Sequence, residues 1–121
     1  IWKLVKNLEQ KIWPFPYGAV EKDSNIILYG AGQMGKDYYQ QIVSSDYCHV
    51  ILWMDQCFLT KEREYPIQGW LDDLNEKQYD KVVIALSRRE DAEEAIALLK
   101  QQNIEENKIV WEIHMRGVSC L

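Results

Sequence analysis

Short apolar runs alternate with amphipathic stretches along most of the chain. The apolar runs have the length of β-strands and lie between polar or turn-forming residues, whereas the amphipathic stretches carry apolar residues at helical spacing. We expect strands over about 26–30, 49–54, 81–86 and 108–112, a short extended piece at 65–67, and helices over about 33–44, 71–78 and 88–102. Alternating strands and helices predict a three-layer α/β/α fold, in which helices cover both faces of a parallel sheet of about 4–5 strands.

The N-terminal segment precedes this alternation and has its own pattern. Its apolar residues at helical spacing are Trp2, Val5, Leu8 and Ile12. This spacing predicts an amphipathic helix that ends before Pro14, because the two prolines between residues 13 and 18 favour an extended connector. We therefore divide the chain into a helix with a Pro/aromatic connector over 1–24 and an α/β domain with a short C-terminal tail over 25–121.

Two helices of the α/β domain have a predicted buried stripe. The residues expected to face the sheet are Met34, Tyr38, Ile42 and Val43 in the first helix, and Ala92, Ala95, Ile96 and Leu99 in the helix at 88–102. Ser87 and Glu90 have the spacing of a capping box for the second of these helices. Asn103 is expected to end that helix in the left-handed conformation.

A glycine-rich loop separates the first strand of the domain from its first helix. The loop consists of Gly30, Ala31, Gly32, Gln33, Met34 and Gly35. In a dinucleotide-binding fold the first glycine permits the turn, the second lets a pyrophosphate approach the backbone, and the third lets the helix pack closely on the strand. The N–H groups at the start of the helix then bind the phosphate. We therefore predict a Rossmann-like nucleotide-binding domain; the alternative is a tight turn retained in a module that binds nothing.

Two further residues are candidates for the same site. Asp55 follows the second strand, 20 residues after Gly35, where a carboxylate accepts hydrogen bonds from the ribose hydroxyls of an adenosine. This position favours NAD over NADP, because the carboxylate would repel a 2′-phosphate and residues 56–60 contain no Arg or Lys. Ser87 lies at the same carboxyl edge of the sheet, although a helix N-cap is the more common role for such a serine. The alternative for Asp55 is an acid that caps a turn or a helix.

Three stretches of the chain resemble a known group of proteins. Residues 29–39, 50–55 and 79–86 resemble bacterial NAD(P)-binding Rossmann modules attached to glycosyltransferases and other surface-polysaccharide enzymes. The resemblance covers about residues 14–112. It implies a fused accessory unit of polysaccharide biosynthesis, with the phosphate role on the three loop glycines and the ribose role on Asp55.

The same stretches are similar to the N-terminal nucleotide-sugar-binding domain of bacterial sugar O- and N-acyltransferases. Residues 66–69 (PIQG) and 71–74 (LDDL) add to this second resemblance. It implies a UDP-linked sugar as the rival of NAD. The sequence has no hexapeptide-repeat half, so an acyl transfer would belong to another part of the protein.

Other nucleotide-dependent enzyme classes fit the sequence less well. Short-chain dehydrogenases and sugar epimerases use a Tyr with a Lys four residues later. The five Tyr residues between 38 and 79 are followed at that spacing by Ile42, Val43, Ile51, Gly69 and Val83. A methyltransferase loop would carry a glycine at Met34 and usually an acid in place of Tyr29. We therefore expect no complete catalytic site in this chain.

Composition limits the partners and the location that we expect. The 121 residues fit one domain, and a formal charge of −5 argues against the positive footprint that DNA or RNA binding needs. The longest strictly apolar runs have five residues, far short of the roughly 20 that cross a bilayer. No secretory signal is visible, and Cys48, Cys57 and Cys120 lack close metal-ligand spacing, so we expect a cytoplasmic protein without a metal.

The sequence therefore predicts a binding module of a larger protein. The chain starts at Ile1 and its first Met is Met34, so we expect an upstream domain on the same polypeptide. The expected function is an accessory domain that binds NAD or a nucleotide sugar in a glycosyltransferase, a sugar acyltransferase or an NAD-dependent enzyme that modifies sugar nucleotides. The alternatives are the cofactor half of a sugar-nucleotide oxidoreductase, and an interaction domain with a vestigial loop that docks or dimerises through the N-terminal helix.

Overall fold

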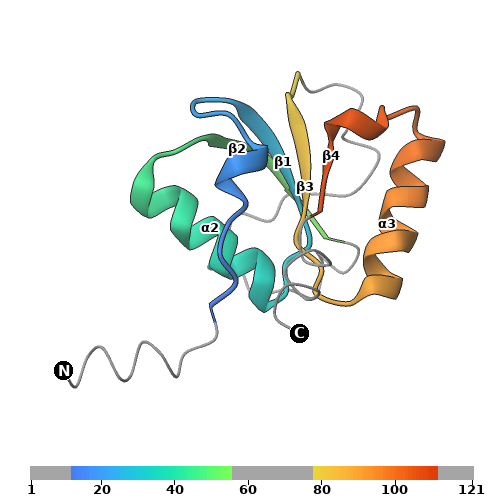
Figure 1. Ribbon diagram of the computed structural model, residues 1–121, viewed down its shortest axis with the longest axis horizontal. Coiled ribbons are helices and arrows are strands. Elements are labelled where there is room, and N and C mark those ends of the chain that lie inside the picture. The colour runs from blue at the N-terminus through green and yellow to red at the C-terminus, as the bar shows by residue number, and fades with distance from the viewer. Residues whose placement is uncertain (1–11, 56–77, 112–121) are drawn as a thin grey trace.

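A computed structural model describes residues 12–55 and 78–111 of the chain. These residues form a four-stranded parallel sheet in the order β2-β1-β3-β4, with two α-helices (Figure 1). The strands are β1 (Asn25–Tyr29), β2 (His49–Met54), β3 (Lys81–Ile84) and β4 (Ile109–Val110). The helices are α2 (Gln33–Ser45) and α3 (Arg89–Gln101), and there are two 3-10 turns, η1 (Tyr17–Ala19) and η4 (Glu106–Lys108). The predicted α/β fold with a parallel sheet is confirmed, and it is consistent with a Rossmann-like fold.

β1 lies between β2 and β3 and sets the register of both neighbours. Against β2 the register shifts once, because Ile26 faces Val50 whereas Ile27 faces Leu52. Against β3 the pairing is regular from Ile26 to Tyr29. The three apolar residues of β3 are fully buried, as expected for a strand inside a parallel sheet.

Each face of the sheet has its own apolar core. The core under α2 includes Met34, Tyr38 and Ile42 of the helix, and Ile26, Leu28, Trp53 and Val83 of the sheet. The core under α3 includes Ala92, Ala95 and Leu99 of the helix, and Ile27, Tyr29, Met54 and Ile84 of the sheet. Neighbouring residues of a strand alternate between the two cores, so α2 and α3 cover opposite faces, as Figure 1 shows.

One member of each predicted helix stripe differs from the expectation. Val43 is 58% exposed, so the prediction that it faces the sheet is wrong. Met34, Tyr38 and Ile42 follow one another at intervals of four residues, and with 3.6 residues per turn the next residue, Val43, points to another side. Ile96 of α3 is only partly buried at the edge of its core.

The predicted capping box of α3 is also wrong. The N-cap is Arg88, whose backbone is extended, and no side chain caps the helix. Ser87 is exposed and lies one residue before the position that a capping box requires. The other end of the helix agrees with the prediction, because Asn103 has a left-handed backbone with φ of 66° and donates its N–H to the carbonyl of Lys100.

Several predicted elements lie outside the described residues. They are the N-terminal helix before Ile12, the extended piece at 65–67 and the helix at 71–78, apart from the last residue of that range. Ile12 itself is 56% exposed. Within the described residues, β3 ends two residues earlier than expected, and β4 is limited to Ile109 and Val110.

The proline-rich connector packs on α2. We call residues 13–17 the N-terminal strap. Phe15 of the strap is 3% exposed and lies edge-on to Tyr38 of α2, with 5.4 Å between the ring centroids. The strap continues into η1 and Val20, which is buried in the same core. The residues that precede β1 are thus part of the packing on the α2 face.

Candidate functional site

The order of the strands creates a crevice at the carboxyl end of β1. The chain passes from β1 through α2 to β2 on one side of β1, and later enters β3 on the other side. In open α/β sheets, ligands bind outside the carboxyl ends of the strands where the direction of winding changes in this way. The loop over residues 30–35 follows β1 and therefore lies at this point.

Gly30 begins the loop in a conformation that only glycine adopts readily. Its φ is +115°, and a Cβ here would lie 2.6 Å from the carbonyl oxygen of Ala85. Its N–H donates to the carbonyl of Met54 at 2.8 Å, and its carbonyl accepts from Nε1 of Trp53 at 2.8 Å. The fold therefore requires glycine at this position and holds its backbone from both sides.

Gly35 is required for a different reason. A Cβ on Gly35 would overlap the carbonyl oxygen of Gly30. Glycine here lets the first turn of α2 lie directly against the start of the loop, which is the packing role expected of the third glycine.

Gly32 differs from both of these glycines. Its φ of −81° and ψ of −162° suit any residue, and a Cβ here would have no heavy atom of the described residues within 4 Å. It is the N-cap of α2 and supplies no side-chain hydrogen bond to the helix. Ser, Asn and Asp are better N-caps than Gly, so nothing in the packing calls for glycine at this exposed position.

Asp55 comes directly after β2, as the sequence predicts, and it contacts the loop. It is only 9% exposed, and its Oδ2 accepts a hydrogen bond from the N–H of Ala31 at 2.7 Å. The buried carboxylate thus fixes the loop and lies beside it.

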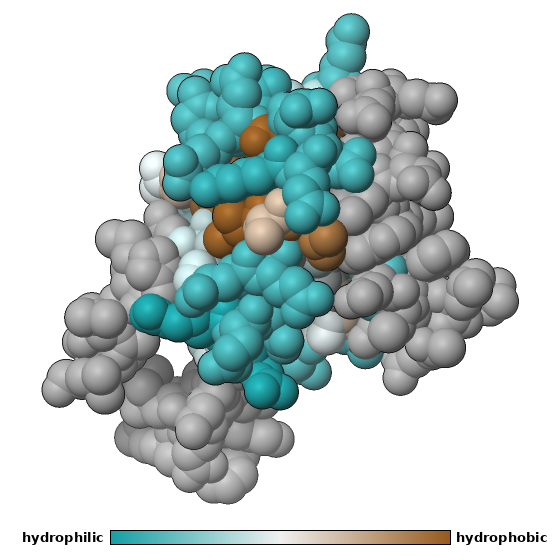
Figure 2. Space-filling view, turned by 90° about the vertical axis from the view of Figure 1, so that its right-hand side faces the viewer, coloured by the Kyte–Doolittle hydropathy of each residue, from teal (hydrophilic) through white to brown (hydrophobic). Residues whose placement is uncertain are grey.

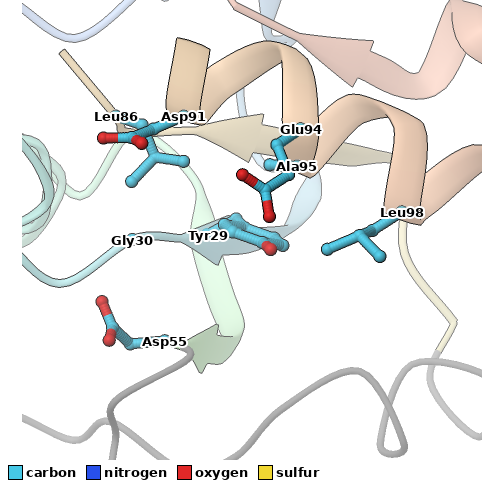
Figure 3. Close-up of a pocket in the computed structure, with 8 residues that line it drawn as sticks. All are labelled: Tyr29, Gly30, Asp55, Leu86, Asp91, Glu94, Ala95 and Leu98. Carbon is cyan, nitrogen blue, oxygen red and sulfur yellow. The ribbon is translucent and has the colours of Figure 1, made fainter. Parts of the chain in front are cut away.

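A pocket of about 230 Å³ adjoins the loop on the α3 side of the sheet (Figure 3). Its lining residues are Tyr29, Gly30, Asp55, Leu86, Asp91, Glu94, Ala95 and Leu98. In Figure 3, Glu94 and Leu98 extend from α3 toward the ring of Tyr29, and Asp55 lies at the end of the pocket near Gly30. The pocket therefore connects the loop with the first turns of α3.

Comparisons of the chain with protein-family models, curated proteins and solved structures found no match. The geometry of the site therefore carries the functional argument. The resemblances noted in the sequence stay predictions.

The electrostatics of the pocket favour hydrogen-bond donors as ligand groups. Three of the described lining residues, Asp55, Asp91 and Glu94, are acids, and none of the described lining residues is Lys or Arg. Burial, with the carboxylates of Asp55 and Glu94, raises the pKa of Tyr29 above its ordinary value, so its phenol stays protonated. Within residues 12–55 and 78–111, no three His, Cys, Asp or Glu side chains are placed to share a metal ion.

Positive charge is found beside the pocket, at the start of α3. Arg88 lies 3.5 Å from Glu90 and 4.0 Å from Asp91, and these side chains are more than half exposed. Exposed ion pairs of this kind contribute little to stability. Figure 2 looks onto the α3 side, where hydrophilic residues surround a small hydrophobic patch on the described surface.

The remaining predicted site residues have different positions. Met34 is buried in the core under α2, so its backbone but not its side chain lies at the loop. Gln33 donates from Nε2 to Asp37 at 2.9 Å. Ser87 is exposed and is absent from the pocket lining.

Sequence reasoning missed four of the polar groups around the pocket. Tyr29 lies in a predicted strand, and Arg88, Asp91 and Glu94 lie in a predicted helix, but none of the four was assigned a site role. A local signal existed for Arg88, since two arginines follow the buried strand β3 at the carboxyl edge. Glu94 had none, because its position in the pocket depends on how α3 packs across the sheet.

No helix in the described part of the chain is long and apolar enough to cross a membrane.

Proposed function

We propose that the loop over residues 30–35 binds the diphosphate of a nucleotide ligand, either NAD or a UDP-linked sugar. The phosphates contact the backbone around Gly32, Gln33 and Met34, and the ribose contacts Asp55. One end of the ligand enters the pocket beside Tyr29. The observation that carries the proposal is the glycine at position 32, which the fold does not require.

Gly32 differs from the other two loop glycines in what the fold requires of it. Gly30 and Gly35 are explained by clashes with Ala85 and with Gly30 itself, whereas a side chain at position 32 would extend into open space. Gly32 leaves α2 without a side-chain cap, and the oxygens of a phosphate are natural acceptors for the first N–H groups of a helix. A missing Cβ at this point lets a phosphate approach the backbone. Ala31 and Gln33 lie on either side of Gly32 in the chain, and their backbone atoms, not their side chains, border the phosphate in this proposal.

Asp55 supports the ribose assignment through its position. Its carboxylate is buried at the carboxyl end of β2 and is anchored on the N–H of Ala31, next to the proposed phosphate site. A ribose attached to that phosphate lies within reach of the same carboxylate. The negative charge opposes a 2′-phosphate, which favours NAD over NADP.

The pocket supports a ligand that is only partly enclosed. Sites that bury a whole drug-sized ligand measure roughly 300–1,000 Å³, and this pocket measures about 230 Å³. It therefore accommodates one ring or sugar, while the diphosphate lies on the loop. Its carboxylates suit hydroxyl or amino groups and disfavour a further phosphate.

We also propose the wider role from the sequence resemblances. The module serves a larger cytoplasmic bacterial protein of surface-polysaccharide biosynthesis and brings it a bound nucleotide, with the chemistry performed by another domain. Ser87 and Arg88, at the start of α3, are additional contacts for the ligand in this proposal.

Titration calorimetry with NAD, NADP, UDP-glucose and S-adenosylmethionine tests the proposal. We expect saturable binding of NAD or UDP-glucose and weaker binding of NADP. Gly32→Ala weakens that binding at least about tenfold, because the new methyl group occupies the phosphate approach. Gly18→Ala is the matched control, because Gly18 is also exposed with no atom near its missing Cβ. Absence of saturable binding by all four compounds, or equal losses in the two variants, contradicts the proposal.

A further inference from the structure

The N-terminal strap is held on α2 by two side chains of the helix. The N–H of Trp13 donates to Oδ2 of Asp37 at 3.2 Å. Gln41, one turn further along, donates from Nε2 to the carbonyl of Trp13 at 2.7 Å and accepts from the N–H of Phe15 at 2.9 Å. The strap is thus bound much as an extended peptide is bound, through backbone hydrogen bonds on alternate residues and a buried side chain at Phe15.

Asp37 also contacts Gln33, the first residue of α2, through an exposed side-chain hydrogen bond. Its Oδ1 accepts from Nε2 of Gln33, which directly follows Gly32, at 2.9 Å. One carboxylate therefore divides its two oxygens between a loop residue and the strap. Because Gln33, Asp37 and Gln41 are four residues apart, they lie along one side of α2 and connect the loop with the strap.

We infer that ligand binding on the glycine loop and docking of the strap on α2 favour each other, with Asp37 as the shared residue. The inference rests on the proposed nucleotide binding at this loop.

Electrostatics give the sign of the coupling. Asp37 carries a negative charge in the second turn of α2, and two donors, from Gln33 and Trp13, partly compensate it. Release of the strap removes the Trp13 donor and leaves a less compensated charge close to the loop, where it opposes an arriving phosphate. Conversely, a phosphate bound at the start of α2 orders Gln33. Gln33 then holds Asp37 in the position that accepts the N–H of Trp13. Both contributions make docking and binding mutually favourable. By linkage, the ligand strengthens docking of the strap by the same factor by which docking strengthens ligand binding.

Amide hydrogen exchange of the whole chain tests the coupling directly. The N–H groups of Trp13 and Phe15 are both bonded to α2 side chains, so their exchange rates report release of the strap. We expect saturating NAD or UDP-glucose, whichever binds, to slow the exchange of both amides by at least about fivefold, the lower end of coupling between linked sites.

The reciprocal experiment uses Gln41→Ala, which removes two strap bonds without touching Gln33 or the loop glycines. We expect this variant to bind the same compound at least about fivefold more weakly, with unchanged affinity in the matched control Gln40→Ala on the exposed neighbour. If Gln41→Ala does not fold, the exchange rates of the natural chain decide the question alone. If a compound binds but neither slows the exchange of the strap amides nor loses affinity in Gln41→Ala, the coupling is overturned and the proposed function stays intact. If neither NAD nor UDP-glucose binds, both the coupling and the proposed function are overturned.

Discussion

At the scale of single residues, the three glycines of the loop are present for different reasons. Gly30 is imposed by a positive φ and the closeness of Ala85, and Gly35 by the carbonyl of Gly30. Gly32 is imposed by neither, and we therefore assign it to the proposed phosphate contact. The sequence pattern alone treats all three alike, and only the surroundings of each missing Cβ distinguish them.

This difference predicts that alanine at position 32 has little effect on stability, whereas alanine at position 35 destabilises the fold. Gly32→Ala changes the free energy of unfolding by less than about 1 kcal/mol, because Ala adopts this backbone and meets no neighbour. Gly35→Ala lowers it by about 1–3 kcal/mol, as expected of an overpacked site. Urea unfolding of both variants measures the difference. Equal losses would mean that position 32 has a structural role and would remove the main support for the ligand site.

Asp55 makes a second prediction at this scale. Asp55→Asn keeps an acceptor for the N–H of Ala31 but removes the negative charge, so NADP affinity rises relative to NAD by roughly tenfold or more. The control is Asp46→Asn, which removes the same charge from the exposed left-handed C-cap of α2. Calorimetric titration with both dinucleotides gives the ratio. An unchanged NAD-to-NADP ratio in Asp55→Asn would contradict the ribose assignment.

At the scale of elements, the strap and α2 form one packing unit. Phe15 lies among the rings of Tyr17, Tyr38 and Tyr47, with centroid distances between 5.2 and 6.4 Å. Tyr47 also donates from its hydroxyl to the carbonyl of Val20 at 2.6 Å. The strap, whose prolines predict an extended connector, is therefore packed into the core on the α2 face.

The packing of the strap predicts a large effect for one substitution. Phe15→Ala lowers the free energy of unfolding by about 3–5 kcal/mol, because it removes a ring that is 97% buried and leaves a cavity. Val43→Ala, on the exposed side of α2, changes it by about 0.5 kcal/mol or less. Chemical denaturation compares the two variants. A loss below about 1 kcal/mol for Phe15→Ala would show that the strap is dispensable for folding.

The elements themselves were largely predictable from local pattern. The apolar runs located all four strands, and the period of apolar residues located α2 and α3, because burial against a sheet imposes those periods. The start of α3 was predicted within one residue, but its cap was not, because Arg88 and not Ser87 is the N-cap. Phe15 packing on Tyr38 depends on contacts 23 residues apart, which no local period records.

At the scale of the whole molecule, the sheet order assembles the site from distant segments. The loop after β1, Asp55 after β2 and Glu94 of α3 meet only because the chain winds to opposite sides of β1. Only the position of Asp55 at the carboxyl end of β2, and not its hydrogen bond to the loop, followed from the spacing of a known binding pattern. The acidic pocket did not, because the facing residues of α3 are set by helix packing across the sheet.

The folded molecule is predicted to lose stability in alkaline solution through Cys48. Burial raises the pKa of the Cys48 thiol from 9.0 to about 11. Between pH 9 and 11 the folded state keeps this proton while the unfolded state loses it, so the free energy of unfolding falls with rising pH, by at most about 1.4 kcal/mol per pH unit. Cys48→Ala is less stable at neutral pH, but its stability declines less steeply in this window. Urea unfolding at pH 8 to 11 measures both slopes, and parallel curves would contradict the assignment.

The central claim is that the backbone around Gly32 binds a phosphate of a nucleotide. The most direct measurement is a two-dimensional amide NMR titration of the labelled chain with NAD and with UDP-glucose. We predict saturable shifts for one compound that are largest at the amides of Gly32, Gln33 and Met34, and that Gly32→Ala loses. No saturable shifts at these amides with either compound would contradict the account.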